Sequence, residues 1–238
     1  NQRYEYSGLK PGTRMGWMRS VCNIFHSFSS NSFVDEMAFA ADQDPLEYRL
    51  KLLGDQRRNY QVPGMQAPKG HEMDLARIGN VVEKVGELSD WNRNRGPGRG
   101  LGLAIHHSFR SYVATVLDVT VEGNEYKVNE AFVVLDCGTY INPNTCVAQM
   151  EGAVIFGLSL AMIGKISLEE GQVVQGNFDD YPVLRITESP KIKVELIESD
   201  ELPAGVGEPG VPPVAPALVN AIFAASGKRV RKLPVEIA

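Results

Sequence analysis

Apolar positions recur at helical spacing in three segments of the first ninety residues. Residues 29–41 repeat apolar side chains every three or four positions behind a start rich in Ser and Asn, which predicts an amphipathic helix. The sequence 44–47 then provides an N-cap Asp, a Pro suited to the first helical position and a Glu at N3, and Gly54 follows as a stop signal. Residues 74–88 place aliphatic side chains on one face. The pattern therefore predicts three helices before residue 90.

The pattern changes to strand spacing after residue 110. Residues 111–121 and 126–135 are rich in Val, Thr and aromatic residues and are separated by Glu-Gly-Asn-Glu, which predicts a β-hairpin. Further expected elements are a helix from Pro143 toward Met162, strands at 165–168, 172–174 and 191–198, and a helix over 215–226 that ends at Gly227. This mixture predicts an α/β (α+β) fold, with mixed sheets and packed helices.

The chain divides into three expected regions. Residues 1–56 form a helical segment, residues 57–98 a linker plus a helix, and residues 99–238 an α/β domain that ends in a loop and a helix. The linker is expected at 57–70, where Gln, Asn, Pro and Gly crowd together and periodicity vanishes. The Gly-rich run 95–102 lacks the spacing of a nucleotide-binding loop, so we expect it to form a flexible entry to the sheet.

Composition and charge narrow the class of protein. The 238 residues are 43% hydrophobic, which is enough for a substantial core. A net charge of -5 disfavours binding to nucleic acid or to anionic membranes. We expect no membrane span, because no apolar run approaches the roughly 20 residues that a span needs. A soluble protein is therefore expected, in the cytoplasm or the periplasm, and the absence of an initial Met suggests a piece of a longer chain.

Several familiar site motifs are missing from the sequence. Cys22, Cys137 and Cys146 show neither zinc-ligand spacing nor a disulfide pattern, so they are expected to be small buried or half-buried thiols. His106 and His107 are adjacent, so in a strand they would face opposite sides and could not chelate one metal ion. No G-x-S-x-G segment is present, which removes the simplest route to a serine hydrolase.

One carboxylate stands out in the C-terminal quarter. Glu208 lies within Gly-Val-Gly-Glu-Pro-Gly-Val-Pro-Pro, residues 205–213, where glycines permit close approach and prolines restrict the backbone. Such a stiff frame suits a residue that is held against a ligand. A merely solvated loop glutamate is the alternative at this point, since most glutamates in loops are solvated.

Three blocks of sequence carry a resemblance to a known family. They are residues 205–223, residues 136–159 and the turn Arg-Met-Gly-Trp-Met-Arg-Ser-Val at 14–21. In this order they resemble the C-terminal portion of the molybdopterin-binding subunit of molybdenum hydroxylases of the isoquinoline 1-oxidoreductase β-subunit type, within the xanthine dehydrogenase and aldehyde oxidase family. The resemblance implies a molybdopterin-binding domain over 99–238, to whose cofactor site the segment 1–56 contributes.

The resemblance also implies roles for individual residues. Glu208 would be the catalytic base that takes a proton from a hydroxide on the molybdenum, and the metal itself would be held by the pterin dithiolene with no direct protein ligand. The implied cofactor-binding residues are Trp17, Met18, Arg19, Gln149 and Gly207. Xanthine dehydrogenases carry Ala-Phe-Arg-Gly where this chain has Trp17 to Ser20, so the resemblance implies backbone contacts from this turn and does not extend to a side-chain role for Arg19.

The implied enzyme is an oxidoreductase that hydroxylates an aldehyde or N-heterocycle with oxygen from water. Its cofactor would be molybdenum-molybdopterin in the cytosine dinucleotide form. Electrons would leave through iron-sulfur clusters of a partner subunit, because no cysteine pattern here could bind such clusters. The remainder of the large subunit would precede this chain, and the chain alone would be inactive. The alternative is a structural or interaction module of the same fold without a cofactor.

Overall fold

A mixed four-stranded sheet forms the centre of the computed structural model, which describes residues 7–8, 12, 16–54 and 72–237. Strand order is β1-β2-β3-β6. Pairs β1–β2 and β2–β3 are antiparallel, whereas β3 and β6 are parallel. The strands are β1 (Arg99–Ser108), β2 (Ser111–Glu122), β3 (Glu125–Asp136) and β6 (Lys191–Leu196). The expected hairpin at 111–135 and the strand near 191–198 are confirmed, as is the α/β (α+β) class.

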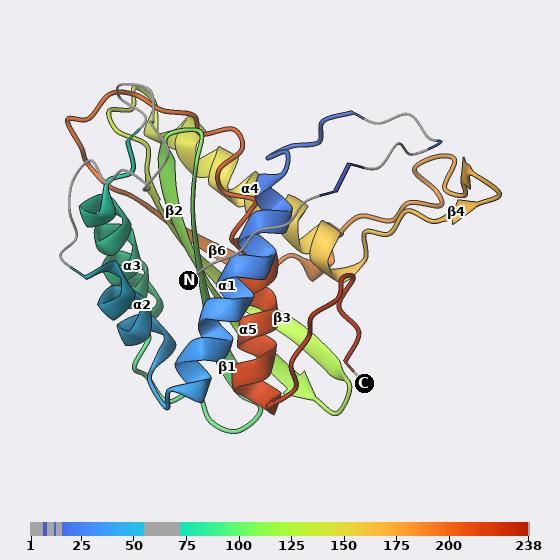
Figure 1. Cartoon of the computed structure of the whole chain (residues 1–238), viewed down its shortest axis with the longest axis horizontal. Helices are drawn as coiled ribbons and strands as arrows, with labels where there is room; N and C mark the ends of the chain where they lie inside the picture. Colours follow the sequence, from blue (N-terminus) through green and yellow to red (C-terminus); the bar gives the residue numbers. More distant parts are fainter. Residues whose placement is uncertain (1–6, 9–11, 13–15, 55–71, 238) are drawn as a thin grey trace.

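Helices cover both faces of this sheet (Figure 1). One face carries α2 (Pro45–Leu53) and α3 (Leu75–Ser89), and the other carries α4 (Pro143–Met162) and α5 (Val214–Ser226). Strand β2 serves both cores, because alternate side chains of a strand point to opposite faces. Val113 packs into the core under α4 and α5, and Val116 into the core under α2 and α3. The result is a three-layer domain with two hydrophobic cores.

Helix α1 (Asn23–Ala40) contacts strand β1 at the edge of the sheet. The Asn31 side chain accepts a hydrogen bond from the Ile105 N–H and donates one to the Ile105 carbonyl, both at 3.0 Å. It thereby satisfies backbone groups that an edge strand otherwise leaves open to other chains. Arg49 of α2 donates to Asn31 Oδ1 at 2.9 Å, and burial lowers the pKa of this arginine to about 10. One polar network therefore joins α1, α2 and β1.

Glycines let the backbone of α5 lie directly on β1. A Cβ added to Gly102 would lie 2.1 Å from the Ala221 nitrogen and 2.2 Å from the Ala217 oxygen, and one on Gly100 would meet α5 almost as closely. The prediction that residues 95–102 form a flexible entry is therefore wrong for its second half, since Arg99 to Gly102 belong to β1. The spacing of apolar residues did not predict this strand, because Gly100 and Gly102 interrupt the pattern where α5 packs against them.

Capping signals predicted the start of α2 and the end of α5 correctly, whereas α3 was predicted from its apolar face. The Asp44 side chain accepts hydrogen bonds at the start of α2, Asp74 does so for α3, and Gly227 ends α5 with φ 73°. Helix α1 is an exception: it begins at Asn23 instead of near residue 29 and has no side-chain cap. The expected linker at 57–70 lies outside the described residues.

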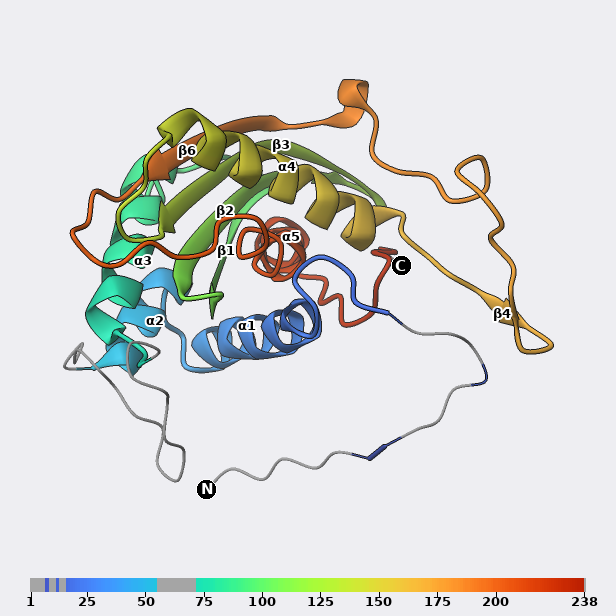
Figure 2. The same cartoon turned by 90° about the horizontal axis from the view of Figure 1, so that it is seen from above.

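The segment between α4 and β6 forms an arm that extends away from the sheet (Figures 1 and 2). The strands expected at 165–168 and 172–174 shrink to a two-residue ladder of β4 (Leu168–Glu169) and β5 (Gln172–Val173), and a short 3-10 helix (Ile186–Glu188) follows. Without a neighbouring sheet, strand-like composition gives little strand.

Helix α4 is long and apolar enough to cross a membrane by length and composition, although polar residues of its first half, such as Gln149 and Glu151, interrupt the apolar run. A single such helix is weak evidence for a span, because the core helix of a soluble protein passes the same test. Its buried face, which includes Met150, Val154 and Leu158, packs into the core shared with β2, β3 and α5.

We expect Gly102→Ala to destabilise the domain by about 1–3 kcal/mol, because the new methyl group must displace the α5 backbone. Gly152→Ala in α4 is the matched control, since nothing lies within 4 Å of its added Cβ. It should gain about 0.5–1 kcal/mol from the higher helix propensity of Ala. Urea unfolding measures both changes. Equal stability of the two variants would contradict the close approach of α5 and β1.

Candidate functional site

Three segments that are distant in the sequence meet beside the first turns of α5. They are the turn that precedes α1, the N-terminal half of α4 and the loop that leads from β6 into α5. Figure 2 shows this loop returning alongside the sheet to the start of α5, with α1 next to that helix. Glu208, Gln149 and Arg19, which belong to separate sequence blocks, thus lie in one cluster.

The Glu208 carboxylate is half-buried and fixed by the turn before α1. The backbone N–H of Ser20 donates to Glu208 Oε2 at 3.0 Å, and the Ser20 hydroxyl donates to the Glu208 carbonyl at 2.6 Å. Within the described residues, no hydrogen bond engages the other carboxylate oxygen, Oε1. One oxygen is therefore held and the other is available.

The Arg19 side chain joins the other two segments of the cluster. Its Nε donates to the Gly207 carbonyl at 2.6 Å, and its Nη2 donates to the Gln149 side-chain oxygen at 3.1 Å. The guanidinium also lies 5.8 Å from the centre of the Phe156 ring. Burial lowers the pKa of Arg19, and the nearby charge of Glu208 opposes this shift. Sequence reasoning assigned Arg19 only a backbone contact, whereas its side chain ties Gly207 to Gln149.

The turn before α1 has an unfavourable backbone conformation. Ser20 has φ 73° and Val21 has φ 52°, a region that L-residues with a Cβ seldom occupy. Each such residue costs on the order of 1–3 kcal/mol and persists only where the surroundings dictate it. Here the two bonds to Glu208 and a bond from the Asn23 amide to the Ser20 carbonyl, at 3.0 Å, fix the turn.

The loop that carries Glu208 is anchored on both sides of that residue. Before it, the Gly205 N–H donates to the Phe109 carbonyl at 3.0 Å, and the Ser111 hydroxyl donates to the Gly205 carbonyl at 2.6 Å. After it, Gly210 packs so closely on α4 that an added Cβ would lie 2.9 Å from the Met150 sulfur. The carboxylate therefore sits on a short, tied segment of backbone.

Free polar groups of the cluster suit a ligand rich in oxygen and nitrogen. Within the described part of the chain, no hydrogen bond engages the backbone N–H groups of Met18, Arg19 and Gly207 or the Gln149 side-chain nitrogen. A Cβ at Gly207 would meet nothing within 4 Å, so the backbone there is open to close approach. Trp17 is 92% exposed. Such donors fit the oxo, pterin and phosphate groups of a molybdopterin cofactor.

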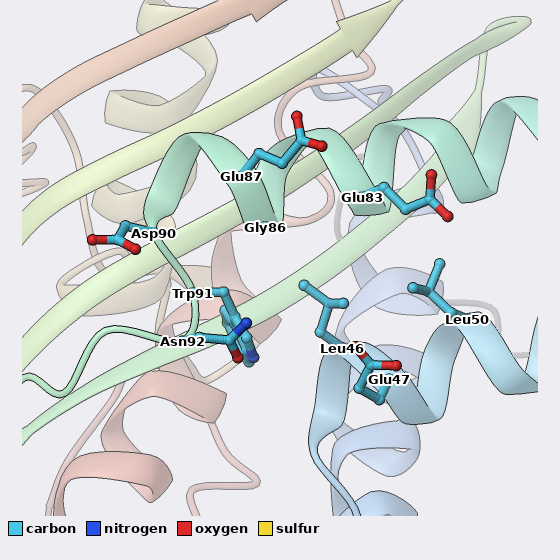
Figure 3. A pocket seen from close by; sticks show the side chains of 9 residues that line it. All are labelled: Leu46, Glu47, Leu50, Glu83, Gly86, Glu87, Asp90, Trp91 and Asn92. Atoms are coloured by element: carbon cyan, nitrogen blue, oxygen red, sulfur yellow. The ribbon is translucent and has the colours of Figure 1, made fainter.

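A hollow lies between α2 and α3, and it is separate from this cluster. Figure 3 shows Leu46 and Leu50 of α2 facing α3 across it, with Glu83 and Glu87 along α3 and Trp91 at the far end. None of its lining residues belongs to the Glu208 cluster. Trp91 donates to the side chain of Asp44, the residue that caps α2. These contacts explain the hollow as the seam between two packed helices.

The prediction of buried or half-buried thiols is confirmed for Cys137 and Cys146 and is wrong for Cys22. Cys137 and Cys146 are buried thiols and Cys22 is exposed, and all three are free. His106 and His107 face opposite sides of β1: the His106 ring contacts Asn23, while the His107 ring stacks on Tyr112. No group of three or more His, Cys, Asp and Glu side chains that could hold a metal ion occurs in residues 16–54 and 72–237.

Sequence reasoning missed Ser20 and Asn23. Ser20 is fully buried and makes both contacts to Glu208, and Asn23 holds the Ser20 carbonyl. A usable signal for Ser20 was its place in the turn, where xanthine dehydrogenases carry Gly. For Asn23 the sequence offers no signal, because its second partner, His106, lies 83 residues away.

Comparison with known proteins gives similarity along most of the chain. A family model described as molybdopterin cofactor-binding domain matches residues 82–190, a range that includes Gln149 but not Glu208. The chain is 33% identical to the beta subunit of isoquinoline 1-oxidoreductase from Brevundimonas diminuta, over 93% of this chain and 27% of that protein. It is also 33% identical to a nicotinate dehydrogenase subunit from Pseudomonas putida, over 99% of this chain and 20% of that protein.

A third relative has a name that specifies a different cofactor. It is the membrane-bound aldehyde dehydrogenase [pyrroloquinoline-quinone] of Gluconacetobacter polyoxogenes, 34% identical over 94% of this chain and 29% of that protein. The cofactor assignment here therefore rests on the family model. The chain spans between 20% and 29% of the length of these three relatives.

Solved structures share the fold. The aldehyde oxidoreductase from Desulfovibrio gigas superposes with a TM-score of 0.66 over 91% of this chain and 40% of that one, at 14% identity. The enzyme from Desulfovibrio desulfuricans gives a TM-score of 0.65 over 92% of this chain and 40% of that one, also at 14% identity. Sequence similarity, family model and fold agree. Residues 82–190 match the molybdopterin cofactor-binding domain, and most of the chain is similar to subunits of isoquinoline 1-oxidoreductase and nicotinate dehydrogenase.

Proposed function

We propose that this chain forms part of the active site of an oxidoreductase that hydroxylates an aldehyde or an N-heterocycle, with Glu208 as catalytic base. The observation that carries the proposal is the Glu208 carboxylate, which Ser20 holds through one oxygen beside Arg19. A base must lie within hydrogen-bond reach of the proton that it removes and must keep that position. The anchored loop provides this constraint.

Each side chain of the cluster has a distinct task in this proposal. Glu208 Oε1 accepts a proton from the attacking oxygen, which derives from water, while the Ser20 N–H keeps Oε2 in place. Arg19 holds Gly207 against Gln149. Gln149, Gly207 and the backbone amides of Trp17, Met18 and Arg19 would bind the cofactor. When bound, the molybdenum cofactor supplies the two-electron redox chemistry.

Other components of the enzyme would lie outside this chain. The chain covers 29% or less of its three curated relatives, so the rest of the large subunit completes the site around the segment 1–56 and the domain 99–238. Three cysteines cannot hold iron-sulfur clusters of the required kind, and a partner subunit would carry the electrons away. The cofactor form proposed is the cytosine dinucleotide, and the chain by itself is expected to be inactive.

Glu208→Gln in the complete enzyme should lower kcat by about 10²–10⁴-fold, because the amide cannot accept the proton. Molybdenum content should stay at the level of the unmodified enzyme, since the amide oxygen can still accept the Ser20 N–H. Steady-state kinetics with an aldehyde and an N-heterocycle, together with metal analysis, provide the measurement.

Glu83→Gln is the matched control, because Glu83 is exposed on α3 and lies outside the cluster. It should leave kcat unchanged. A metal-loaded Glu208→Gln enzyme with full activity would refute the assignment of the base. Absence of molybdenum from the complete unmodified enzyme would favour a cofactor-free structural module instead.

Gln149→Ala tests contact with the cofactor. The substitution removes the free amide nitrogen and one acceptor of Arg19, while the backbone acceptor at 3.3 Å remains. We expect loss of molybdenum or slower turnover by about 10–100-fold. Unchanged metal content with unchanged kinetics would show that the Gln149 side chain only satisfies Arg19.

A further inference from the structure

We propose that Asn23 and His106 are positioning residues for Glu208, which they fix through the strained turn at Ser20. This inference rests on the proposed role of Glu208 as the base. Neither residue belongs to the three sequence blocks at 14–21, 136–159 and 205–223, although His106 lies within the range 82–190 that the family model matches. Neither contacts Glu208 directly. Their effect passes along a chain of hydrogen bonds that begins on strand β1 and ends at the carboxylate.

Three hydrogen bonds of ordinary length link His106 to Glu208. His106 Nε2 lies 3.0 Å from Asn23 Oδ1, Asn23 Nδ2 donates to the Ser20 carbonyl at 3.0 Å, and the Ser20 N–H donates to Glu208 Oε2 at 3.0 Å. The Ser20 hydroxyl adds a second bond to the Glu208 backbone. The Ser20 carbonyl accepts both the backbone N–H of Asn23, at 3.0 Å, and the Asn23 side chain. The side-chain bond links the backbone of Ser20, and with it the N–H that contacts Glu208, to the sheet through His106.

Hydrogen-bond chemistry determines the direction of each bond. The Ser20 carbonyl can only accept, so the Asn23 amide must present its NH₂ group to Ser20 and its oxygen to His106. His106 must then carry its proton on Nε2. Burial, together with the neighbouring His107 and His26, lowers the pKa of His106 to about 4, so the ring is neutral at neutral pH and this tautomer suffices for the contact.

The neighbouring histidine offers an internal comparison. His107 lies on the same strand, and its pKa is also lowered to about 4, by burial first and by the charge of Arg77 second. Its ring stacks on Tyr112, with 4.3 Å between ring centres. Two half-buried histidines on one strand thus differ in one respect that matters here: His106 alone of the two contacts Asn23.

Strain in the turn makes this support necessary. Ser20 and Val21 both have positive φ, a conformation that reverts to an extended or helical one unless contacts prevent it. If the turn relaxed, the Ser20 N–H would move away from Oε2 and the carboxylate would gain freedom. Misplacement of a reacting group by about 1 Å can slow an enzyme by about 10²-fold.

Asn23→Asp in the complete enzyme is the decisive variant. The replacement has almost the same shape and keeps an acceptor for His106, but it sets a second acceptor against the Ser20 carbonyl. We expect kcat to fall by about 10–100-fold with little change in KM. We also expect faster hydrogen exchange of the Ser20 amide, a signal that does not depend on turnover.

His106→Phe and His107→Phe form a matched pair. Both replace a neutral imidazole on β1 by a phenyl ring, but only the first removes the donor to Asn23, and the second preserves the ring stack on Tyr112. His106→Phe should reproduce the kinetic and exchange effects of Asn23→Asp in weaker form, whereas His107→Phe should show neither. His106→Gln, whose amide can donate to Asn23, should recover most of the loss.

The outcomes separate this inference from the proposed function. Faster Ser20 exchange in Asn23→Asp without a fall in kcat would overturn the positioning role, as would equal effects of the two Phe variants. Full activity of metal-loaded Glu208→Gln would refute the base itself, even if the Ser20 amide still lost its protection in Asn23→Asp. A Ser20 amide that exchanges freely in the unmodified enzyme would contradict the geometry on which the inference stands.

Discussion

The backbone of α5 lies directly on strand β1, and this contact determines where the Glu208 loop must end. Gly100 and Gly102 leave no side chain between strand and helix. On the opposite side, an added Cβ at Gly157 of α4 would lie 2.6 Å from the Val214 side chain, at the first residue of α5. Because the helix start is confined from two sides, the loop that leads into it has little freedom.

The strand on which α5 rests also supports the turn before α1. Strand β1 provides His106 for Asn23 and the backbone of Ile105 for Asn31, so α1 is tied to β1 at both its first residue and its middle. The turn at Ser20 precedes that helix, and Glu208 precedes α5 by a few residues. Because α1 and α5 both pack on β1, the turn before α1 and the loop before α5 lie close together, and Ser20 can contact Glu208.

Local signals predicted much of the fold, and long-range contacts decided the rest. The β2–β3 hairpin, the capped start of α2 and the apolar face of α3 follow from neighbouring residues, so the sequence alone predicted them. Strand β1 was missed because its glycines are explained only by α5, more than a hundred residues later. In the site, the resemblance pointed to Glu208 and Gln149. The contacts of the Arg19 side chain could not be predicted in this way, because Gln149 and Gly207 lie 130 and 188 residues after Arg19, and no periodic pattern in the sequence extends over such separations.

Ser20 shows how a departure from the family pattern can be compatible with the site. Glycine, which xanthine dehydrogenases carry there, adopts φ 73° freely, whereas a left-handed backbone costs Ser about 1–2 kcal/mol. The Ser20 hydroxyl in turn donates to the Glu208 carbonyl at 2.6 Å, and such a bond contributes about 0.5–1.5 kcal/mol. The two effects nearly cancel in stability. The hydroxyl nevertheless changes the geometry of the site, because its bond fixes the Glu208 backbone in addition to the carboxylate that the Ser20 N–H holds.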